Sequence, residues 1–197
     1  MARRDQPDRY AKQARREGYA ARSVYKLEEL QHRFALIQPA MRVLDVGAAP
    51  GSWSQLASKI VGNRGCIVAV DLADLPGLDG VKNVETICGD IHDPEVIERI
   101  VGLGPYDAII SDAAPRTSGN RTLDTTRSAA IVEQVLWLCE RVLAREGNLV
   151  AKLFQGGEEQ LLLQEVRRRF ATGRLLKPKA SRDESFEVFL VGTGYEG

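Results

Sequence analysis

The segment VLDVGAAPGSWSQ, residues 43–55, constrains the fold of this chain more than any other stretch. Three β-forming residues and an acid lead into a turn that contains Gly47 and Gly51, and a helix-compatible run follows. Glycine lets the backbone turn sharply and approach a ligand closely, while N–H groups at the start of the next helix attract polar ligand atoms. A strand, a glycine turn and a helix in this order predict a nucleotide-like cofactor site in an α/β fold.

Strand-like and helix-like segments alternate along the rest of the chain. Short apolar runs predict strands, and apolar residues at helical spacing predict helices. The first strand is expected to begin near residue 41, and the next strands cover 65–72, 83–90, 106–115 and 148–157. The expected helices cover about 52–61, 93–101 and 124–143, and a last helical stripe precedes two closing strands within 173–179 and 185–192. This order predicts a doubly wound, mainly parallel sheet with a hairpin-like pair at its edge.

The N-terminal segment, residues 1–34, is expected to join a catalytic core of residues 35–197 in one domain, because 197 residues suit a single α/β domain. Residues 1–19 are polar and are predicted to be loosely ordered unless something binds them. A helix is expected from Ala20, with Lys26 near the edge of its apolar stripe. The local sequence alone favours a solvated role for Lys26.

Four charged residues fall at the ends of different predicted strands. They are Asp71, Asp90, Asp112 and Lys152. Ligands of doubly wound sheets bind at the C-terminal strand ends, and a carboxylate at the position of Asp71 commonly binds ribose hydroxyls. Burying a charge without a partner is costly, which argues against four charges without a function at these positions. The pattern predicts a functional site at this end of the sheet.

The glycine spacing narrows the choice of cofactor. GAAPG has the spacing G-x-x-x-G, whereas dinucleotide oxidoreductases use G-x-G-x-x-G, and no P-loop motif G-x-x-x-x-G-K-[ST] occurs. A cofactor with ribose and adenine but no pyrophosphate fits an acid-rich site better than NAD does. S-adenosylmethionine is such a cofactor, and its sulfonium and ammonium groups suit an acidic pocket.

Composition argues against several other classes. The longest apolar runs are far too short to span a bilayer, and the polar N-terminus lacks the apolar core of a signal peptide. The cysteines Cys66, Cys88 and Cys139 are odd in number and form no C-x-x-C pair, which favours reduced thiols over a disulfide frame or a zinc site. With only two histidines, no metal site is expected. A cytoplasmic protein without membrane association is predicted.

The net charge of zero conceals a pattern. Residues 1–33 carry nine Lys or Arg and five acids, residues 34–166 carry 11 and 18, and residues 167–182 carry seven basic residues and no acid. Solvated helix faces explain many such runs. Here, however, two basic segments flank an acidic cofactor domain, and this arrangement predicts that they form the two walls of a groove for a polyanion. The reason is that phosphate contacts dominate affinity for nucleic acid.

Several motifs, in this order and spacing, resemble the FtsJ-like (RrmJ/RlmE) family of ribosomal RNA 2′-O-methyltransferases over nearly the whole chain. The matching segments are YAKQARREGYAARSVYKL, VLDVGAAPGSWSQ, VAVDL, CGDI, SDAAPRTSG, VAKLFQG and SFEVFLVG. The resemblance implies an α/β, doubly wound, Rossmann-like methyltransferase fold. Its seven-stranded sheet is mostly parallel and its last strand is antiparallel. S-adenosylmethionine is the implied cofactor.

The resemblance also implies the catalytic residues. The family's tetrad of Lys, Asp, Lys and Glu matches Lys26, Asp112, Lys152 and Glu187, which replaces the solvated role of Lys26. As a hypothesis, Lys152 removes the proton of a ribose 2′-hydroxyl. An unperturbed lysine has a pKa of about 10.4, so burial and the charges of Lys26 and the sulfonium must lower it. The two carboxylates would orient Lys152, and Lys26 would align the hydroxyl. In an alternative, Lys152 stays charged and acts only electrostatically.

Cofactor contacts follow from the same resemblance. It implies contacts from Gly51 and Trp53, with Gly47 shaping the turn, and it places Asp71 at the ribose. It further places Asp90 at the adenine amine and Asp112 near the methionine end.

Three places depart from the family pattern. Ser52 replaces the second glycine of a common Gly-Gly pair, Ala113 and Arg116 differ from the SDMAPN pattern, and residues 20–22 read AAR in place of RSR. None of these residues belongs to the tetrad. Arg116 is expected to alter RNA contacts beside the active site.

The implied function is 2′-O-methylation of a uridine in the A-loop of large-subunit rRNA, late in ribosome assembly. The expected substrate is the assembled large subunit, and the expected enzyme is a monomer. One alternative is a tRNA or cap 2′-O-methyltransferase, and the compact chain favours the ribosomal one. Another is a non-catalytic RNA-binding assembly factor, against which the four costly charges argue. A third, an NAD-dependent oxidoreductase, conflicts with the glycine spacing.

Overall fold

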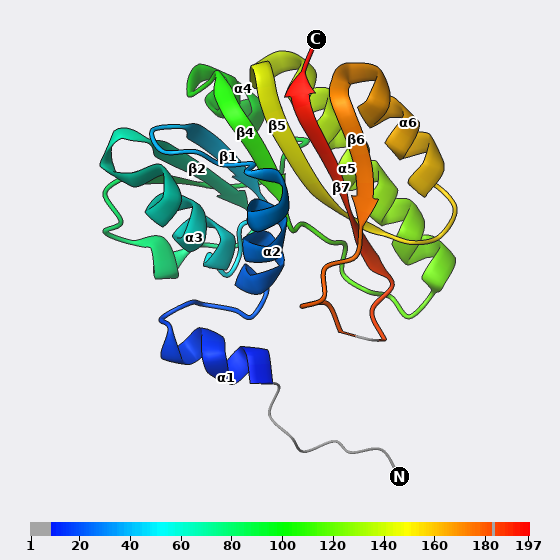
Figure 1. Cartoon of the computed structure of the whole chain (residues 1–197), viewed down its shortest axis with the longest axis horizontal. Helices are drawn as coiled ribbons and strands as arrows, with labels where there is room; N and C mark the ends of the chain where they lie inside the picture. The colour runs from blue at the N-terminus through cyan, green and yellow to red at the C-terminus, as the bar shows by residue number, and fades with distance from the viewer. Residues whose placement is uncertain (1–8, 183) are drawn as a thin grey trace.

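The computed structural model describes residues 9–182 and 184–197 (Figure 1). A seven-stranded sheet with the order β3-β2-β1-β4-β5-β7-β6 forms its centre. The strands are β1 (Arg42–Val46), β2 (Cys66–Asp71), β3 (Val84–Cys88), β4 (Tyr106–Ser111), β5 (Leu143–Phe154), β6 (Phe170–Leu176) and β7 (Glu187–Tyr195). Strands β1 to β5 pair in parallel, and β7 pairs antiparallel with both β5 and β6. The predicted sheet with its antiparallel last strand is confirmed.

Helices cover both faces of this sheet (Figure 1). Their bounds are α1 (Arg9–Arg16), α2 (Val24–Phe34), α3 (Ser52–Val61), α4 (Pro94–Gly102), α5 (Arg121–Val142) and α6 (Glu159–Arg169). Helices α2 and α3 pack on one face, where Leu27 and Trp53 join a buried cluster with Val150 and Phe189. Helices α4, α5 and α6 pack on the other face. The strands are mostly apolar because helices bury both faces of the sheet.

Local sequence signals set where the helices begin. Asp93 caps α4 by accepting a hydrogen bond from the Glu95 N–H, and Pro94 occupies the first helical position, where a missing N–H costs nothing. Asn120 caps α5 in the same way, accepting from the Leu123 N–H. Gly51 is the N-cap of helix α3, and its φ of 105° is readily adopted only by glycine. The predicted helix after the glycine turn is thus confirmed.

Within the N-terminal segment, residues 9–16 are more ordered than the sequence predicts. Residues 9–16 form helix α1, whereas the polar composition of residues 1–19 suggests a loosely ordered stretch. The helix has a reason to form here because Ala14 is buried and the Tyr10 ring lies 5.4 Å from the ring of Tyr25 in α2. Helix α2 begins at Val24, four residues later than expected. Predictions about residues 1–8 lie outside the described residues.

The antiparallel direction of β7 brings its first residue to the functional end of the sheet. Parallel strands finish together at one end, which we call the C-terminal end of the sheet. Because β7 runs the opposite way, it begins there, and Glu187 pairs with Phe154, the last residue of β5. A glutamate that is far from the other charged residues in sequence therefore lies among them.

The sequence predicts one continuous basic wall over residues 167–182, and this prediction is wrong for its first part. Arg167–Arg169 end α6 where β6 begins, at the end of the sheet opposite to the C-terminal end (Figure 1). Residues 177–182 follow β6 and lie at the C-terminal end. The seven residues of β6, about 23 Å of strand, separate the two groups. Arg169 also pairs with Glu140 at 2.8 Å.

The described residues contain neither a membrane-spanning helix nor a cluster of metal-binding side chains. No helix in ranges 9–182 and 184–197 is long and apolar enough to cross a membrane. Within the same ranges, no group of three or more His, Cys, Asp or Glu side chains is placed to hold a metal ion.

Candidate active site

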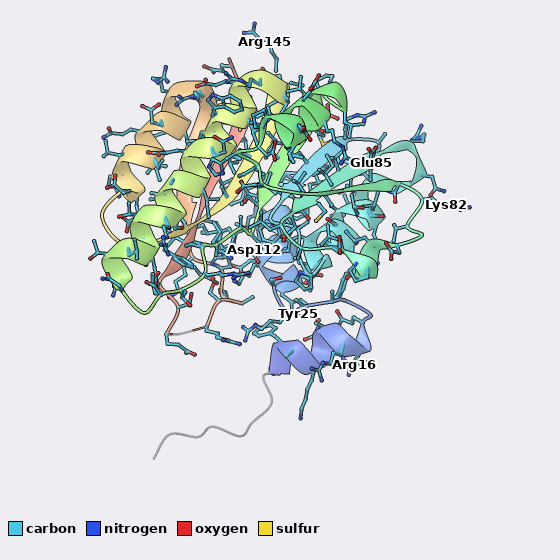
Figure 2. All side chains as sticks on the ribbon, turned by 180° about the vertical axis from the view of Figure 1, so that it is seen from behind. Arg16, Tyr25, Lys82, Glu85, Asp112 and Arg145 are labelled. Carbon is cyan, nitrogen blue, oxygen red and sulfur yellow. The ribbon has the colours of Figure 1, made fainter. Side chains whose placement is uncertain are left out.

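A cavity of about 450 Å³ opens at the C-terminal end of the sheet. Gly47, Asp71, Asp90 and Asp112, which follow or end four different strands, contribute to its wall. Figure 2 shows Asp112 near the middle of the molecule, at the end of the sheet that is nearer to Tyr25 and α1. The structure therefore brings together the acids that the sequence places at separate strand ends.

Gly47 allows two strands to approach each other beneath this cavity. Its φ is +73°, and a Cβ atom at this position would lie 2.5 Å from the Cβ of Ala113. Its N–H donates to the Val70 carbonyl oxygen at 2.8 Å. A side chain here would force β1 and the segment after β4 apart, so Gly47 shapes the cavity by leaving space.

Asp71 and Asp90 are held by hydrogen bonds from nearby backbone. The Asp71 carboxylate accepts from the N–H groups of Ala49, in the glycine turn, and Ala73, each at 2.9 Å. Asp90 accepts from the backbone N–H of His92 at 2.9 Å, and its Oδ1 lies 2.8 Å from the His92 Nδ1. These bonds from His92 lower the pKa of Asp90 below its ordinary value. Each carboxylate retains acceptor capacity for a ligand.

Gly51 and the Trp53 side chain are placed differently from the acids. Neither contributes to the cavity wall, and Trp53 is only 2% exposed. The Trp53 indole stacks on Phe189 with a centroid distance of 5.8 Å, and its Nε1–H donates to the Ser23 carbonyl oxygen at 2.9 Å. The side chain thus anchors the start of α2 on the core. The Gly51 N–H donates to the Ala48 carbonyl oxygen at 2.6 Å, so a cofactor contact from this pair would use the backbone N–H of Trp53, in the first turn of α3.

The Ser52 departure from the family pattern has a visible role. Its side chain is buried, and its Oγ lies 2.9 Å from the Oγ of Ser23. This hydrogen bond joins the start of α3 to the residue before α2. Ser52 therefore supports the same junction as Trp53.

Two buried ion pairs lie beside the cavity. The Lys152 Nζ lies 3.0 Å from Asp112 Oδ1 and also donates to the Asp112 main-chain oxygen. The Lys26 Nζ lies 2.5 Å from Glu187 Oε1. The four side chains are between 10% and 17% exposed. All members of the predicted tetrad thus lie together, as two pairs rather than as four separate charges.

The sheet register accounts for this arrangement. Lys152 pairs with Phe189 across β5 and β7, and Phe154 pairs with Glu187. Side chains two residues apart on a strand share a face, so Lys152 and Glu187 are diagonal neighbours on the face covered by α2. Helix α2 brings Lys26 to the same place, with its Nζ 5.8 Å from the Phe189 ring centroid.

Electrostatics link the two pairs. Burial by itself would raise the pKa of Glu187, but the hydrogen bond and positive charge of Lys26, together with the charge of Lys152, bring this pKa below its ordinary value. Glu187 is therefore ionised at neutral pH and interacts with both lysines. Buried charges of this kind persist only when they are mutually compensated.

The Asp112 carboxylate retains acceptor capacity for a ligand. Its Oδ1 is buried and has no hydrogen-bond partner among residues 9–182 and 184–197, although Lys152 is close enough for an ion pair. A buried acceptor without a hydrogen bond is unfavourable unless a ligand supplies the donor. Asp112 belongs to the tetrad and also lines the cavity, so the carboxylate acceptors of the cavity wall fit a cofactor with cationic groups and hydroxyls. S-adenosylmethionine has both.

Asp45 is a residue whose importance the sequence reasoning missed. It lies within β1, is fully buried, and accepts a hydrogen bond from the Ser54 Oγ at 2.6 Å. Its Oδ1 has no hydrogen-bond partner in the described part of the chain. Burial, with a smaller contribution from the charges of Asp112 and Asp71, raises its pKa to about 7. The available signal was an acid inside an otherwise apolar strand.

Replacing Asp45 with asparagine is expected to remove a pH dependence of folding stability. An unfolded aspartate has a pKa of about 3.9, well below the folded value of about 7. The native state therefore keeps a proton that the unfolded chain loses, and Asp45 lowers the free energy of unfolding as the pH rises between these values, by at most about 1.4 kcal/mol per unit.

Urea titrations of both proteins at about pH 5 and about pH 8 measure this effect. The free energy of unfolding of the asparagine variant should rise relative to that of the wild type between the lower and the higher pH. A difference that does not change with pH would contradict the assignment.

Comparisons with known proteins extend the argument. Residues 19–195 match the family model described as FtsJ-like methyltransferase. Ribosomal RNA large subunit methyltransferase E of Treponema denticola is 44% identical over 192 residues, covering 98% of this chain and 96% of the relative. The enzyme of the same name from Syntrophobacter fumaroxidans is 45% identical over 191 residues, covering 94% of each chain.

Solved structures agree with these relatives. A ribosomal RNA methyltransferase from Plasmodium falciparum has a TM-score of 0.79 at 25% identity and covers 91% of this chain and 100% of its own. Fibrillarin from Aeropyrum pernix, solved with S-adenosyl-L-methionine bound, shares the fold with a TM-score of 0.65 at 16% identity, covering 87% of this chain and 76% of its own. The fold, the acidic cavity and the full-length similarity agree, and the chain belongs to the FtsJ-like methyltransferase family.

Proposed function

We propose that this chain transfers a methyl group from S-adenosylmethionine to a ribose 2′-hydroxyl of large-subunit rRNA. The observation that carries the proposal is the buried set Lys26, Asp112, Lys152 and Glu187 beside a cavity lined by carboxylates. The relatives named as large-subunit rRNA methyltransferases support this choice of substrate. The resemblance of the motifs supports a uridine of the A-loop as the target, late in ribosome assembly.

Each residue of the cavity wall binds a different part of the cofactor in this proposal. Asp71 accepts hydrogen bonds from the ribose hydroxyls, Asp90 accepts from the adenine amine, and Asp112 faces the methionine end. Gly47 leaves room for close approach, while Gly51 closes the turn through its own N–H, which donates to the Ala48 carbonyl oxygen at 2.6 Å, and the Trp53 N–H remains for the polar end of the ligand. The bound cofactor supplies an activated methyl group on its sulfonium.

The tetrad prepares the nucleophile. A hydroxyl is a poor nucleophile until it loses its proton, so a base must stand within reach of it. After losing its own proton, Lys152 accepts the hydroxyl proton at its Nζ as a neutral amine, and the Asp112 carboxylate and main-chain oxygen hold the ammonium that this restores. Lys26, fixed by Glu187, aligns the hydroxyl and offsets the negative charge that develops on its oxygen. The four side chains are only 10% to 17% exposed, and this burial strengthens the interactions among them.

Replacing Asp71 with alanine is expected to weaken cofactor binding and to leave turnover at saturating cofactor less affected. The carboxylate holds the glycine turn through Ala49 and offers acceptors to the ribose, and hydrogen bonds to charged groups are worth about 1.5–3 kcal/mol. Calorimetric titration with S-adenosylmethionine should give a dissociation constant raised by about tenfold or more. An unchanged constant would reject the role of Asp71.

The substrate can be tested by giving the enzyme a choice. Incubation with methyl-labelled S-adenosylmethionine and, separately, unmodified large ribosomal subunits, free large-subunit rRNA and tRNA should label the assembled subunit best. Labelling of tRNA alone would favour the tRNA enzyme instead. Absence of labelling with intact cofactor binding would favour a non-catalytic assembly factor.

The remaining parts of the proposal concern organisation. We infer one methyltransferase domain over residues 1–197, in which residues 1–34 contribute Lys26 and a basic surface while residues 35–197 form the catalytic core. Acting as a monomer in the cytoplasm on an assembled subunit suits this compact chain. Sedimentation of the purified protein would test the monomer.

A further inference from the structure

A second cavity, of about 310 Å³, opens beside the Lys26–Glu187 pair. Asp112 contributes to the wall of the first cavity, whereas Lys26 and Glu187 contribute to the wall of the second. The tetrad therefore stands between the two cavities. Because the cofactor occupies the first in the proposed function, the second offers the nucleotide that supplies the hydroxyl a path to Lys26.

Cationic side chains from two distant segments meet in this second cavity. Arg22 precedes α2, and Arg182 lies between β6 and β7. Together with Lys26 they place three cations around the space, against the two carboxylates of Glu184 and Glu187. Since Glu187 is engaged by Lys26 at 2.5 Å, the other charged groups around the space are Arg22, Arg182 and Glu184.

The two arginines are close enough to affect each other. Burial, followed by the positive charge of Arg182, lowers the pKa of Arg22, although Glu187 and Glu184 act in the opposite direction. Neighbouring guanidinium groups repel, and an anion between them relieves this repulsion while accepting charge-assisted hydrogen bonds. A phosphate suits this geometry because guanidinium groups can bind it through two N–H donors each.

The segment that carries Arg182 is held in position. The Arg22 Nη2 donates to the Ala180 carbonyl oxygen at 2.5 Å, and the Lys179 N–H donates to Glu29 Oε2 at 2.7 Å. On the other side of Arg182, the Lys177 Nζ donates to the Ser185 carbonyl oxygen at 2.6 Å. The Lys179 contact ties the segment to α2, the Arg22 contact ties it to the stretch before α2, and the Lys177 contact joins its two ends. The backbone that carries Arg182 is therefore positioned close to Arg22.

We propose that Arg22 and Arg182 bind the phosphodiester on the 3′ side of the target ribose. The 2′-oxygen and the 3′-phosphate are carried by adjacent ribose carbons, so a 2′-hydroxyl placed at Lys26 and Lys152 brings its own 3′-phosphate next to the tetrad. The second cavity is the cationic space at that position. This assignment rests on the proposed function and adds a positioning subsite to it.

The subsite predicts a loss of substrate binding without a loss of cofactor binding. Arg182→Gln and Arg22→Gln should each raise the KM for large ribosomal subunits by about tenfold, as expected for a lost charge-assisted hydrogen bond. The slope of log affinity for the subunit against log salt should fall by about one for each. The double variant should be less impaired than the product of the single effects, because both side chains bind one phosphate.

Two further variants separate binding from folding and from overall charge. Arg22→Lys keeps the charge and should recover part of the loss. Arg145→Gln removes one exposed arginine from the opposite end of the sheet, far from Asp112 in Figure 2, and should leave the KM unchanged. For every variant, the calorimetric dissociation constant for S-adenosylmethionine should equal that of the wild type.

The results distinguish the subsite from the function on which it rests. Wild-type methylation with an unchanged KM in both Gln variants would overturn the subsite and leave the proposed function intact. An equal loss in Arg145→Gln would also overturn it, because the effect would then be a general one of charge. If the wild type methylates no large subunit, the proposed function fails and the subsite fails with it.

Discussion

Lys152→Ala is expected to reduce methyl transfer by about 10³-fold or more while leaving the affinity for S-adenosylmethionine unchanged. Lys152 contacts Asp112 through both its carboxylate and its main-chain oxygen, and it is only 10% exposed. It is not part of the wall of the cofactor cavity. Its loss therefore removes the proton acceptor and leaves the cofactor contacts in place. Single-turnover rates and calorimetric titration measure the two quantities separately.

Lys152→Arg separates the two roles that the sequence leaves open for this residue. Arginine keeps the positive charge but cannot be deprotonated in a protein. If Lys152 accepts a proton, the arginine variant should be as inactive as the alanine variant. Substantial turnover by Lys152→Arg would contradict the role of a base and favour a purely electrostatic one.

Lys26→Met is expected to abolish turnover and to lower the free energy of unfolding by about 3 kcal/mol. The reason is that Glu187, which is 10% exposed, would lose the partner that lies 2.5 Å from its carboxylate. Burial would then raise the pKa of Glu187, which Lys26 keeps below its ordinary value in the wild type. Methionine preserves apolar packing against Phe189, so the loss reports the charge. Urea titration and single-turnover assays measure both effects.

A paired variant provides the control for this prediction. In Lys26→Met/Glu187→Leu no buried charge remains unpaired, so most of the lost stability should return. Turnover should stay absent, because neither the aligning cation nor its partner is present. Recovery of activity along with stability would show that the pair serves folding alone.

Much of the fold could be predicted from the sequence because its signals are local. The glycine turn, the buried apolar strands and the capping residues each act over a few residues, and the helix after Gly51 begins and ends where it was expected, at residues 52 and 61. Helix α1 was not predicted because it depends on a tertiary contact, the packing of Tyr10 on Tyr25. Such a contact is invisible in a polar stretch of sequence.

The site was predictable in its members but not in its pairing. Strand ends alone indicate Asp71, Asp90, Asp112 and Lys152, whereas Lys26 and Glu187 came from the family resemblance. That Lys26 pairs with Glu187 depends on the register of β5 and β7 and on the packing of α2. The second cavity depends on the meeting of segments 160 residues apart, at Arg22 and Arg182, which no local pattern reports.

The central claim is that the tetrad directs a methyl group to a ribose oxygen, and the position of the methyl group tests it most directly. Large-subunit rRNA labelled by the wild-type enzyme can be hydrolysed completely with alkali, which cleaves a phosphodiester only where the neighbouring 2′-hydroxyl is free. We predict that the label is recovered in alkali-resistant dinucleotides at one position. Label recovered in mononucleotides would place the methyl group on a base and contradict the account.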